Sequence, residues 1–271
     1  MISFNGYYMD YIGEIRPSGV EQTAKKIEYL ANKYSSNKVF YSVVPSKSYF
    51  INDSLKKPFD YNKMFEILNS NIKSATYIDI TDTLSLNDYY ITDPHYKQDK
   101  LTLLVNKLGQ YLDFNIDISK NELIKVDSFT GQHGANVKDI KSEEIYYMTN
   151  QYIDGAVVTN IMGDSFNKVY NTDKLNSSSQ YDLFLSGPSP LCTIKNEMAD
   201  TDKRLIIFND SYSLSLAPLL IENYSEIVLV DLRYVASVLI ENYVKIDNAD
   251  ILFLYNEQVV NNGEMLKVIF N

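Results

Sequence analysis

A serine in a polar turn is the first residue of this chain that could carry covalent chemistry. Ser211 follows an apolar run at residues 204–208, which predicts a buried strand, and precedes residues 213–224, which predict a helix. At such a junction the hydroxyl projects from the strand end, the backbone N–H is an unpaired donor, and the helix dipole favours negative charge. A nucleophile whose substrate becomes an oxyanion needs these properties. The turn lacks the GxSxG pattern of a nucleophile elbow, so the alternative that Asp210 or Ser211 only caps the helix stays open.

A histidine in a second loop could supply the general base that a serine needs. His95 follows Asp93 by two residues in the segment 89–96, and the ordinary pKa of histidine, about 6.5, suits proton transfer near neutrality. Asp93 could orient the imidazole and stabilise its charged form, with Pro94 restricting the backbone between them. An isolated Asp-x-His is common by chance, so His95 could also be a surface or helix-cap residue. The pairing of two loop sites at strand ends of one sheet favours a common site with Ser211.

The other histidine and the single cysteine are less favoured. His133 lies between glycines in a predicted turn, with no carboxylate within a few residues. Cys192 lies in a mostly apolar stretch, which indicates a small buried side chain rather than a nucleophile. One cysteine excludes an intrachain disulfide, and two histidines with one cysteine exclude zinc-finger and CxxC chemistry. A site made only of carboxylates remains open, but no metal and no cofactor are expected.

The charge balance excludes two classes of partner. The chain has 25 Lys and Arg against 35 Asp and Glu, a formal net charge of -10. Phosphate contacts need clustered basic residues, and no basic run is longer than a pair such as Lys25-Lys26 or Lys56-Lys57, so no nucleic acid is expected as partner. An anionic membrane surface is disfavoured for the same reason. The 23 Tyr and the absence of Trp fit either a bias in nucleotide composition or a surface that stacks on carbohydrate.

Strands and helices are predicted to alternate in two parts of the chain. The predicted strands are residues 39–44, 76–80, 204–208, 226–231 and 250–255, and the predicted helices are residues 19–34, 60–72, 101–112, 213–224 and 234–243. This alternation is typical of parallel βαβ units, whose functional residues lie at the carboxyl ends of the strands. Between the two parts, short alternating segments predict antiparallel strands at residues 123–129, 144–148, 155–160 and 181–185.

The chain of 271 residues is therefore predicted to be one α/β domain with an interruption. Residues 1–112 and 204–271 would form the parallel-sheet domain, and residues 113–203 a β-rich insertion. No segment approaches the length of an apolar membrane span, and residues 1–17 lack the basic and apolar regions of a signal peptide, so the chain as given is expected to be soluble. A signal or anchor could nevertheless have preceded the first residue.

Three blocks of residues resemble the DHHW family, a branch of the SGNH-hydrolase-like proteins related to the alginate-type polysaccharide O-acetyltransferases. The family places an Asp-x-His-aromatic block after paired tyrosines, and this chain has Tyr89, Tyr90, Thr92, Asp93, Pro94, His95 and Tyr96. The later block matches almost completely, with Asp210-Ser211-Tyr212, Pro218, Tyr224-Ser225-Glu226 and Asp231-Leu232-Arg233-Tyr234, and an early turn matches at Val44-Pro45-Ser46-Lys47. Pro94 replaces the family's first histidine and Tyr96 its tryptophan. The resemblance spans residues 39–255.

The resemblance implies an SGNH-like, flavodoxin-like three-layer fold and a catalytic triad. Ser211 would be the nucleophile, His95 the general base, and Asp93 the carboxylate that orients the base. The Ser211 N–H would donate to the oxyanion, and a second donor would come from Gly131 or Gln132.

Further contacts to the substrate are expected from three residues. Tyr90, Lys47 and Arg233 are the candidates, and a role in tying loops together is weighed for Lys47 and Arg233.

The function implied by the resemblance is acetyl transfer through an acetyl-serine intermediate to an extracellular or cell-surface polysaccharide. The implied partner is a membrane-bound O-acyltransferase that supplies the acetyl group, and the implied location is extracytoplasmic, at the cell surface or tethered to a membrane. An acetylesterase would use the same triad. A non-catalytic carbohydrate-binding or assembly protein would be favoured if Ser211 and His95 lay more than about 5 Å apart.

Overall fold

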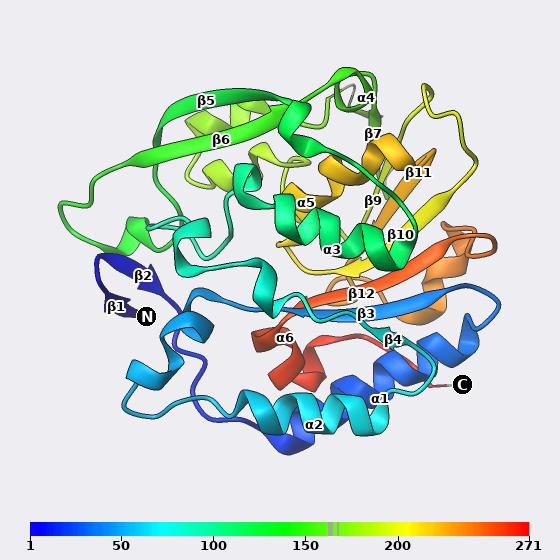
Figure 1. Cartoon of the computed structure of the whole chain (residues 1–271), viewed down its shortest axis with the longest axis horizontal. Helices are drawn as coiled ribbons and strands as arrows, with labels where there is room; N and C mark the ends of the chain where they lie inside the picture. The colour runs from blue at the N-terminus through cyan, green and yellow to red at the C-terminus, as the bar shows by residue number, and fades with distance from the viewer. Residues whose placement is uncertain (162–164, 167, 271) are drawn as a thin grey trace.

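An eight-stranded sheet forms the centre of the molecule (Figure 1). The computed structural model describes residues 1–161, 165, 166 and 168–270. The strand order is β4-β3-β12-β10-β11-β9-β7-β8, and the first five strands run parallel. These five are β4 (Thr76–Tyr77), β3 (Val39–Val44), β12 (Asp250–Asn256), β10 (Arg204–Asn209) and β11 (Glu226–Val230). The expected mixed α/β fold with a mostly parallel sheet is confirmed.

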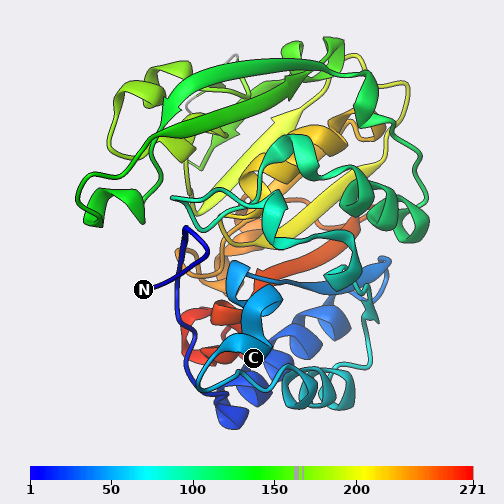
Figure 2. The same ribbon diagram turned by 60° about the vertical axis from the view of Figure 1, so that its left-hand side comes forward.

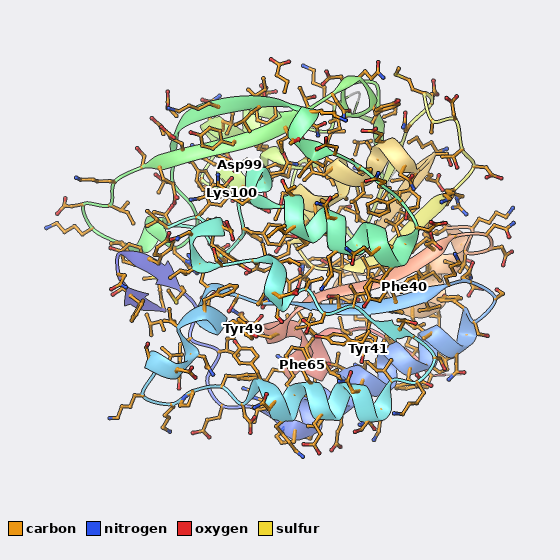
Figure 3. All side chains as sticks on the ribbon, viewed as in Figure 1. Phe40, Tyr41, Tyr49, Phe65, Asp99 and Lys100 are labelled. Atoms are coloured by element: carbon orange, nitrogen blue, oxygen red, sulfur yellow. The ribbon has the colours of Figure 1, made fainter. Side chains whose placement is uncertain are left out.

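Helices cover both faces of this sheet (Figures 1 and 2). On one face lie α1 (Pro17–Lys33), α2 (Tyr61–Asn71) and α6 (Glu257–Asn261), and on the other lie α3 (Thr102–Leu112) and α5 (Ser213–Leu220). Because successive strand residues point to opposite faces, Phe40 and Tyr41 lie on opposite sides of β3 (Figure 3) and belong to two separate hydrophobic clusters. The central strands are buried on both faces, which explains why they are continuously apolar in sequence.

Residues 113–203 contribute strands in two places. Strand β5 (Glu122–Phe129) pairs with β6 (Glu143–Thr149) in a separate antiparallel ribbon. Strands β9 (Leu191–Lys195), β7 (Val157–Asn160) and β8 (Ser165–Phe166) extend the central sheet beyond β11 in antiparallel register. The short helix α4 (Gln151–Asp154) follows β6. The predicted boundaries of the insertion, 113 and 203, stay predictions.

Several short elements complete the chain. Strands β1 (Ile2–Phe4) and β2 (Tyr7–Met9) form an N-terminal hairpin. The 3₁₀ helices are η1 (Lys47–Ser54), η2 (Thr81–Thr83), η3 (Leu86–Asp88), η4 (Gln98–Lys100), η5 (Ile118–Lys120), η6 (Gly134–Asn136), η7 (Thr172–Asn176), η8 (Gln180–Leu183), η9 (Ile221–Asn223), η10 (Ser237–Asn242) and η11 (Gly263–Met265). Among the described residues, no helix combines the length and apolarity needed to cross a bilayer.

Some predicted elements differ from the structure. Residues 181–185, predicted as a strand, contain the end of η8 and a left-handed backbone at Leu185, with φ of 53°, which an extended strand cannot include. The helix predicted at 213–224 is α-helical to Leu220 and continues as the 3₁₀ helix η9 to Asn223. Inside the α-helix, Pro218 has no N–H to donate to the carbonyl four residues before it. The helix predicted at 234–243 is only the 3₁₀ helix η10, since Val238 and Leu239 are exposed and bury no continuous apolar stripe.

Candidate active site

Three side chains form one chain of hydrogen bonds at the carboxyl edge of the parallel strands. The Ser211 Oγ lies 2.8 Å from the His95 Nε2, and the His95 Nδ1 lies 2.6 Å from the Asp93 Oδ1. Ser211 comes two residues after the end of β10, as parallel-strand topology requires of a residue at this edge. The nucleophile, base and carboxylate expected from the sequence are therefore brought together, and the distance between Ser211 and His95 allows proton transfer between them.

The turn that carries Ser211 is fixed by the residue before it. The Asp210 carboxylate accepts from the backbone N–H of Tyr212 at 3.1 Å and from that of Asn256, at the end of β12, at 2.6 Å. Burial raises the pKa of Asp210 above its ordinary value. Asp210 thus stabilises the turn, whereas the Ser211 hydroxyl bonds to His95 rather than to a helix N–H. Within the described residues the Ser211 N–H has no acceptor, so it can donate to a developing oxyanion.

A buried lysine holds the loop that carries Asp93. The Lys47 Nζ donates to the carbonyls of Tyr90 at 2.9 Å, Ile91 at 3.2 Å and Asp93 at 2.8 Å. Burial lowers the pKa of Lys47 to about 8. From the other side, the Glu143 carboxylate accepts from the Ile91 N–H at 2.8 Å. Of the two roles considered for Lys47, contact with substrate and the tying together of loops, its hydrogen bonds fit the second.

The glycine turn after β5 encloses the Asp93 carboxylate. The Gly131 N–H donates to the Thr92 Oγ1 at 2.8 Å, and the Gln132 N–H donates to the Asp93 Oδ2 at 3.1 Å. Both backbone donors that were expected to face an oxyanion are therefore already bonded to the neighbouring loop. Burial raises the pKa of Asp93, but the charge and hydrogen bonds of His95, together with the Gln132 N–H, outweigh it, and the pKa lies below its ordinary value.

The two residues that depart from the family pattern connect the loops of the site. The Tyr96 hydroxyl donates to the carbonyl of Tyr212 at 2.7 Å, and the Tyr212 hydroxyl donates to the carbonyl of Pro94 at 2.9 Å. This reciprocal pair holds the histidine loop against the serine turn. No spacing in the sequence predicts this exchange of bonds, because the two loops are more than a hundred positions apart.

The remaining candidates lie in different surroundings. His133 contacts the Tyr8 carbonyl through Nδ1 at 3.1 Å and the Asp10 carboxylate through Nε2 at 3.3 Å, so it is directed at the N-terminal hairpin. Tyr90 is fully buried and packs on Phe129, away from any substrate surface. Cys192 is buried in β9, and burial raises the pKa of its thiol to about 12, which disfavours the reactive thiolate.

A cleft of about 430 Å³ opens over the serine. It is lined by Asp10, Pro94, His95, Gln132, Pro188, Asp210, Ser211, Tyr212, Arg233, Tyr234, Asn256, Gln258, Val259, Asn262 and Met265. The Arg233 Nη2 is paired with the Asp231 carboxylate at 2.6 Å, and its guanidinium lies 5.5 Å from the Tyr234 ring centre. The Tyr234 side chain is 53% exposed, which leaves an aromatic surface beside the nucleophile. Tyr234 is not among the site residues expected from the sequence.

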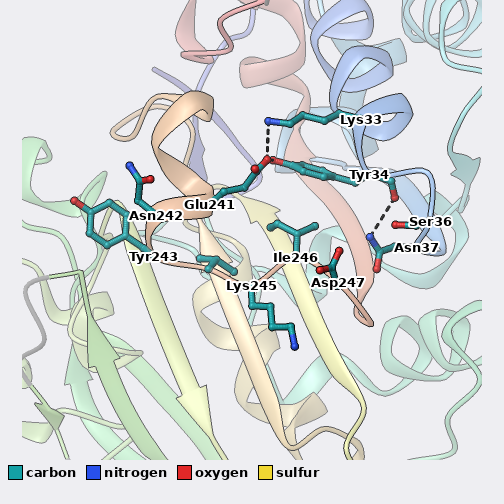
Figure 4. A pocket seen from close by; sticks show the side chains of 11 residues that line it. Lys33, Tyr34, Ser36, Asn37, Glu241, Asn242, Tyr243, Lys245, Ile246 and Asp247 are labelled. Atoms are coloured by element: carbon teal, nitrogen blue, oxygen red, sulfur yellow. Dashed lines mark hydrogen bonds and ion pairs between the residues drawn. The ribbon is translucent and has the colours of Figure 1, made fainter.

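A larger cavity of 590 Å³ lies at the opposite, amino-terminal edge of the parallel strands (Figure 4). It is lined by the end of α1 and by residues 241–247, and it contains the ion pair between Lys33 and Glu241 at 2.6 Å. No lining residue pairs a nucleophile with a base, so the smaller cleft is the candidate site. Among the described residues, no three His, Cys, Asp or Glu side chains are grouped in a way that could hold a metal ion.

No protein-family model matches the chain, and no curated protein matches it in sequence. Solved structures do. A DHHW family protein from Eubacterium siraeum has a TM-score of 0.74 and 16% identity over 91% of this chain and 88% of that chain. Bacillus cereus PatB1 with a sulfonyl adduct has a TM-score of 0.75 and 14% identity over 97% of this chain and 98% of that chain.

The O-acetyltransferase domain of Pseudomonas putida AlgJ is a third structural neighbour. Its TM-score is 0.53, with 10% identity over 90% of this chain and 84% of that chain. The resemblance to the DHHW family and the alginate-type O-acetyltransferases is thus confirmed at the level of the fold.

Proposed function

We propose that this protein is an O-acetyltransferase that modifies a polysaccharide through an acetyl-Ser211 intermediate. The observation that carries the proposal is the hydrogen-bonded chain from the Ser211 Oγ through His95 to Asp93, with distances of 2.8 and 2.6 Å. The likeness in fold to a domain named as an O-acetyltransferase adds the group that would be transferred. The alternative of a decayed, non-catalytic site would be favoured by a large distance between Ser211 and His95, but the two side chains lie within hydrogen-bonding distance.

The first half of the reaction forms the acyl-enzyme. The Ser211 Oγ attacks the carbonyl carbon of an acetyl ester while the His95 Nε2 takes the hydroxyl proton. Asp93 holds the imidazole in the tautomer that accepts at Nε2 and stabilises its positive charge. The oxyanion accepts a hydrogen bond from the Ser211 N–H. Collapse of the tetrahedral intermediate then releases the donor alcohol, which takes the proton back from His95.

The second half transfers the acetyl group. A sugar hydroxyl in the cleft gives its proton to His95 and attacks the acetyl-Ser211 carbonyl, which forms the new ester and restores the serine. Water in place of the sugar would make the protein an acetylesterase, so the occupant of the cleft decides between the two activities. Tyr234 and Arg233 line the cleft at the position where a sugar would approach Ser211. The proposed donor is a membrane-bound O-acyltransferase, and the proposed location is extracytoplasmic.

The test is a comparison of acetyl-ester hydrolysis and intact mass for wild type, Ser211→Ala and Ser213→Ala. Ser213 is buried two residues further along the chain and makes no bond to His95, so it is the matched control. We expect turnover and an acetyl adduct in wild type and Ser213→Ala only. A sulfonyl fluoride should label the same serine. Turnover that survives in Ser211→Ala would remove the serine from the mechanism.

Transferase and esterase are then distinguished by the acceptor. With a soluble acetyl donor and an oligosaccharide, a transferase accumulates the acetylated sugar faster than free acetate. Acetate alone, at every sugar concentration, would establish the esterase.

A further inference from the structure

The His95 ring is covered by a tyrosine from a distant part of the chain. The Tyr181 ring lies parallel to the imidazole, with a centre-to-centre distance of 3.9 Å and an angle of 5° between the planes. Tyr212 contacts the imidazole in an edge arrangement at 4.8 Å. The base is therefore enclosed by two aromatic rings in addition to its hydrogen bonds to Ser211 and Asp93.

The position of Tyr181 is fixed by its hydroxyl and by the residue before it. Its hydroxyl bonds to the Ser215 Oγ at 2.8 Å, on the helix that follows the nucleophile. The preceding residue, Gln180, accepts from the Thr130 N–H at 2.7 Å and donates to the Leu175 carbonyl at 2.6 Å. The ring is only 6% exposed, so it cannot swing away from His95 without disrupting this packing.

We propose that Tyr181 is a positioning residue: its ring fixes the plane of the His95 imidazole and stabilises the imidazolium that forms when His95 takes the Ser211 proton. The face of a tyrosine ring carries negative electrostatic potential, which attracts a cation placed over it. The attraction is stronger in a site sheltered from water. Because a neutral imidazole gains less from this contact, the stack favours the charged form. The inference rests on the proposed function only for the role of His95 as base.

Other titratable and charged groups surround His95 and remain constant in the test. Asp93 and Asp182 interact with it electrostatically. Asp10, Asp210, Tyr212 and Arg233 line the same cleft, and Lys47 bonds to the Asp93 carbonyl. Burial keeps the Tyr181 phenol neutral by raising its pKa well above the ordinary value. The ring therefore acts through its π system and not as a phenolate.

The test is the titration of His95, followed by NMR in protein with ¹⁵N-labelled histidine. Only two histidines are present, and the spectrum of His95→Gln assigns the signals. Tyr181→Phe keeps the ring and should leave the titration midpoint of His95 unchanged. Tyr181→Leu removes the π system and should lower the midpoint by about 0.5 unit or more, which corresponds to a cation–π contact. Phe184→Leu is the matched control, because Phe184 packs on Tyr181 at 5.0 Å but lies in no ring contact with His95.

A second substitution keeps the shape of the ring. Pentafluorophenylalanine at position 181 reverses the electrostatic potential of the face, so the midpoint should fall relative to Tyr181→Phe even if the leucine variant does not fold. An unchanged or raised midpoint with the fluorinated ring would overturn the inference. The proposed function is tested separately by the acetyl adduct on Ser211. If the adduct is missing but the fluorinated ring lowers the His95 midpoint, the proposed reaction is wrong, and the effect of Tyr181 on the imidazolium still holds.

Discussion

Gly131 packs directly against Asp93, with no room for a side chain between them. A Cβ at residue 131 would lie 2.2 Å from the Asp93 Cβ and 2.6 Å from the Asp93 Cα. The neighbouring N–H of Gln132 bonds to the Asp93 carboxylate at 3.1 Å. The backbone of this turn is thus the surface on which the triad carboxylate rests, which explains why a glycine occupies the position.

Gly131→Ala should therefore displace Asp93 and weaken catalysis. The methyl group would force the two backbones apart, and a shift of about 1 Å at a catalytic group can cost about 100-fold in rate. We expect kcat/KM for an acetyl ester to fall by about that factor and the free energy of unfolding to fall by about 1 to 3 kcal/mol. Ester kinetics and urea unfolding measure the two effects.

Gly155→Ala is the matched control for this prediction. Its Cβ would meet the Met198 Sδ at 3.1 Å and the Gln151 carbonyl oxygen at 3.2 Å, and neither residue lines the cleft over Ser211. This variant should keep wild-type kinetics. Equal losses of activity in both variants would mean that contact with Asp93 is not the cause.

Much of the site could be predicted because its signals are local. The apolar run of β10 followed by Ser211 identifies a strand end, and Asp93 and His95 are two residues apart. Parallel topology then requires both loops to meet at one edge of the sheet. The resemblance in sequence motifs pointed to the same three residues.

The rest of the site depends on contacts between distant segments. Tyr181 reaches His95 from the 3₁₀ helix η8, in a segment whose short alternating pattern predicted a strand instead. Gly131 and Gln132 were chosen from the correct turn, but only three-dimensional packing reveals that their N–H groups face Thr92 and Asp93. Such tertiary hydrogen bonds leave no periodic pattern in the chain.

Asp93→Asn should lower activity far more than stability. The amide can favour the wrong imidazole tautomer and no longer stabilises the imidazolium, and in a serine protease the equivalent change costs about 10⁴-fold in kcat. We expect a loss of about 10³- to 10⁴-fold in ester turnover with the fold retained. Ester turnover is measured in stopped assays, and an unchanged circular dichroism spectrum shows that the fold is retained.

The pH profile of the wild type should identify the general base independently. Because the pKa of Asp93 lies below its ordinary value, its charge is lost only in acid below the assay range. The acid limb of kcat/KM between about pH 5 and 8 should therefore report deprotonation of a histidine. His95→Gln should abolish turnover, whereas His133→Gln should be mild, since His133 faces Tyr8 and Asp10. The reverse ranking would identify His133 as the base.

Lys47→Met should loosen the loop that carries Asp93. Three loop carbonyls lose their donor, and a buried acceptor left without a partner costs about 1 to 3 kcal/mol. We expect lower stability and at least about a 10-fold loss in kcat, since Asp93 is no longer held in place. Lys26→Met is the control: Lys26 is also buried and bonds two carbonyls, but these belong to Gly263 and Leu266. It should lose stability and keep kcat.

The same lysine predicts a dependence of stability on pH. Its pKa is about 8 in the folded chain against 10.5 as the ordinary value, so between these pH values the unfolded chain binds more protons. Stability from this group therefore rises with pH across that interval, by up to about 3 kcal/mol. The difference in unfolding free energy between wild type and Lys47→Met should widen from pH 7 to pH 10. A constant difference would show that Lys47 has the same pKa in the folded and the unfolded chain, and so that burial does not shift it.

Tyr234→Ala should weaken binding of the sugar acceptor without affecting the chemistry at Ser211. Tyr234 is 53% exposed and lines the cleft, so a pyranose ring can stack on it, a contact of about 0.5 to 1.5 kcal/mol. We expect KM for an oligosaccharide acceptor to rise about 2- to 10-fold, with hydrolysis of a small acetyl ester unchanged and Tyr234→Phe like wild type. Tyr243→Ala is the control, because Tyr243 is 57% exposed but lines the cavity at the opposite edge of the sheet. If both alanine variants raise KM equally, or neither does, the acceptor does not lie on Tyr234.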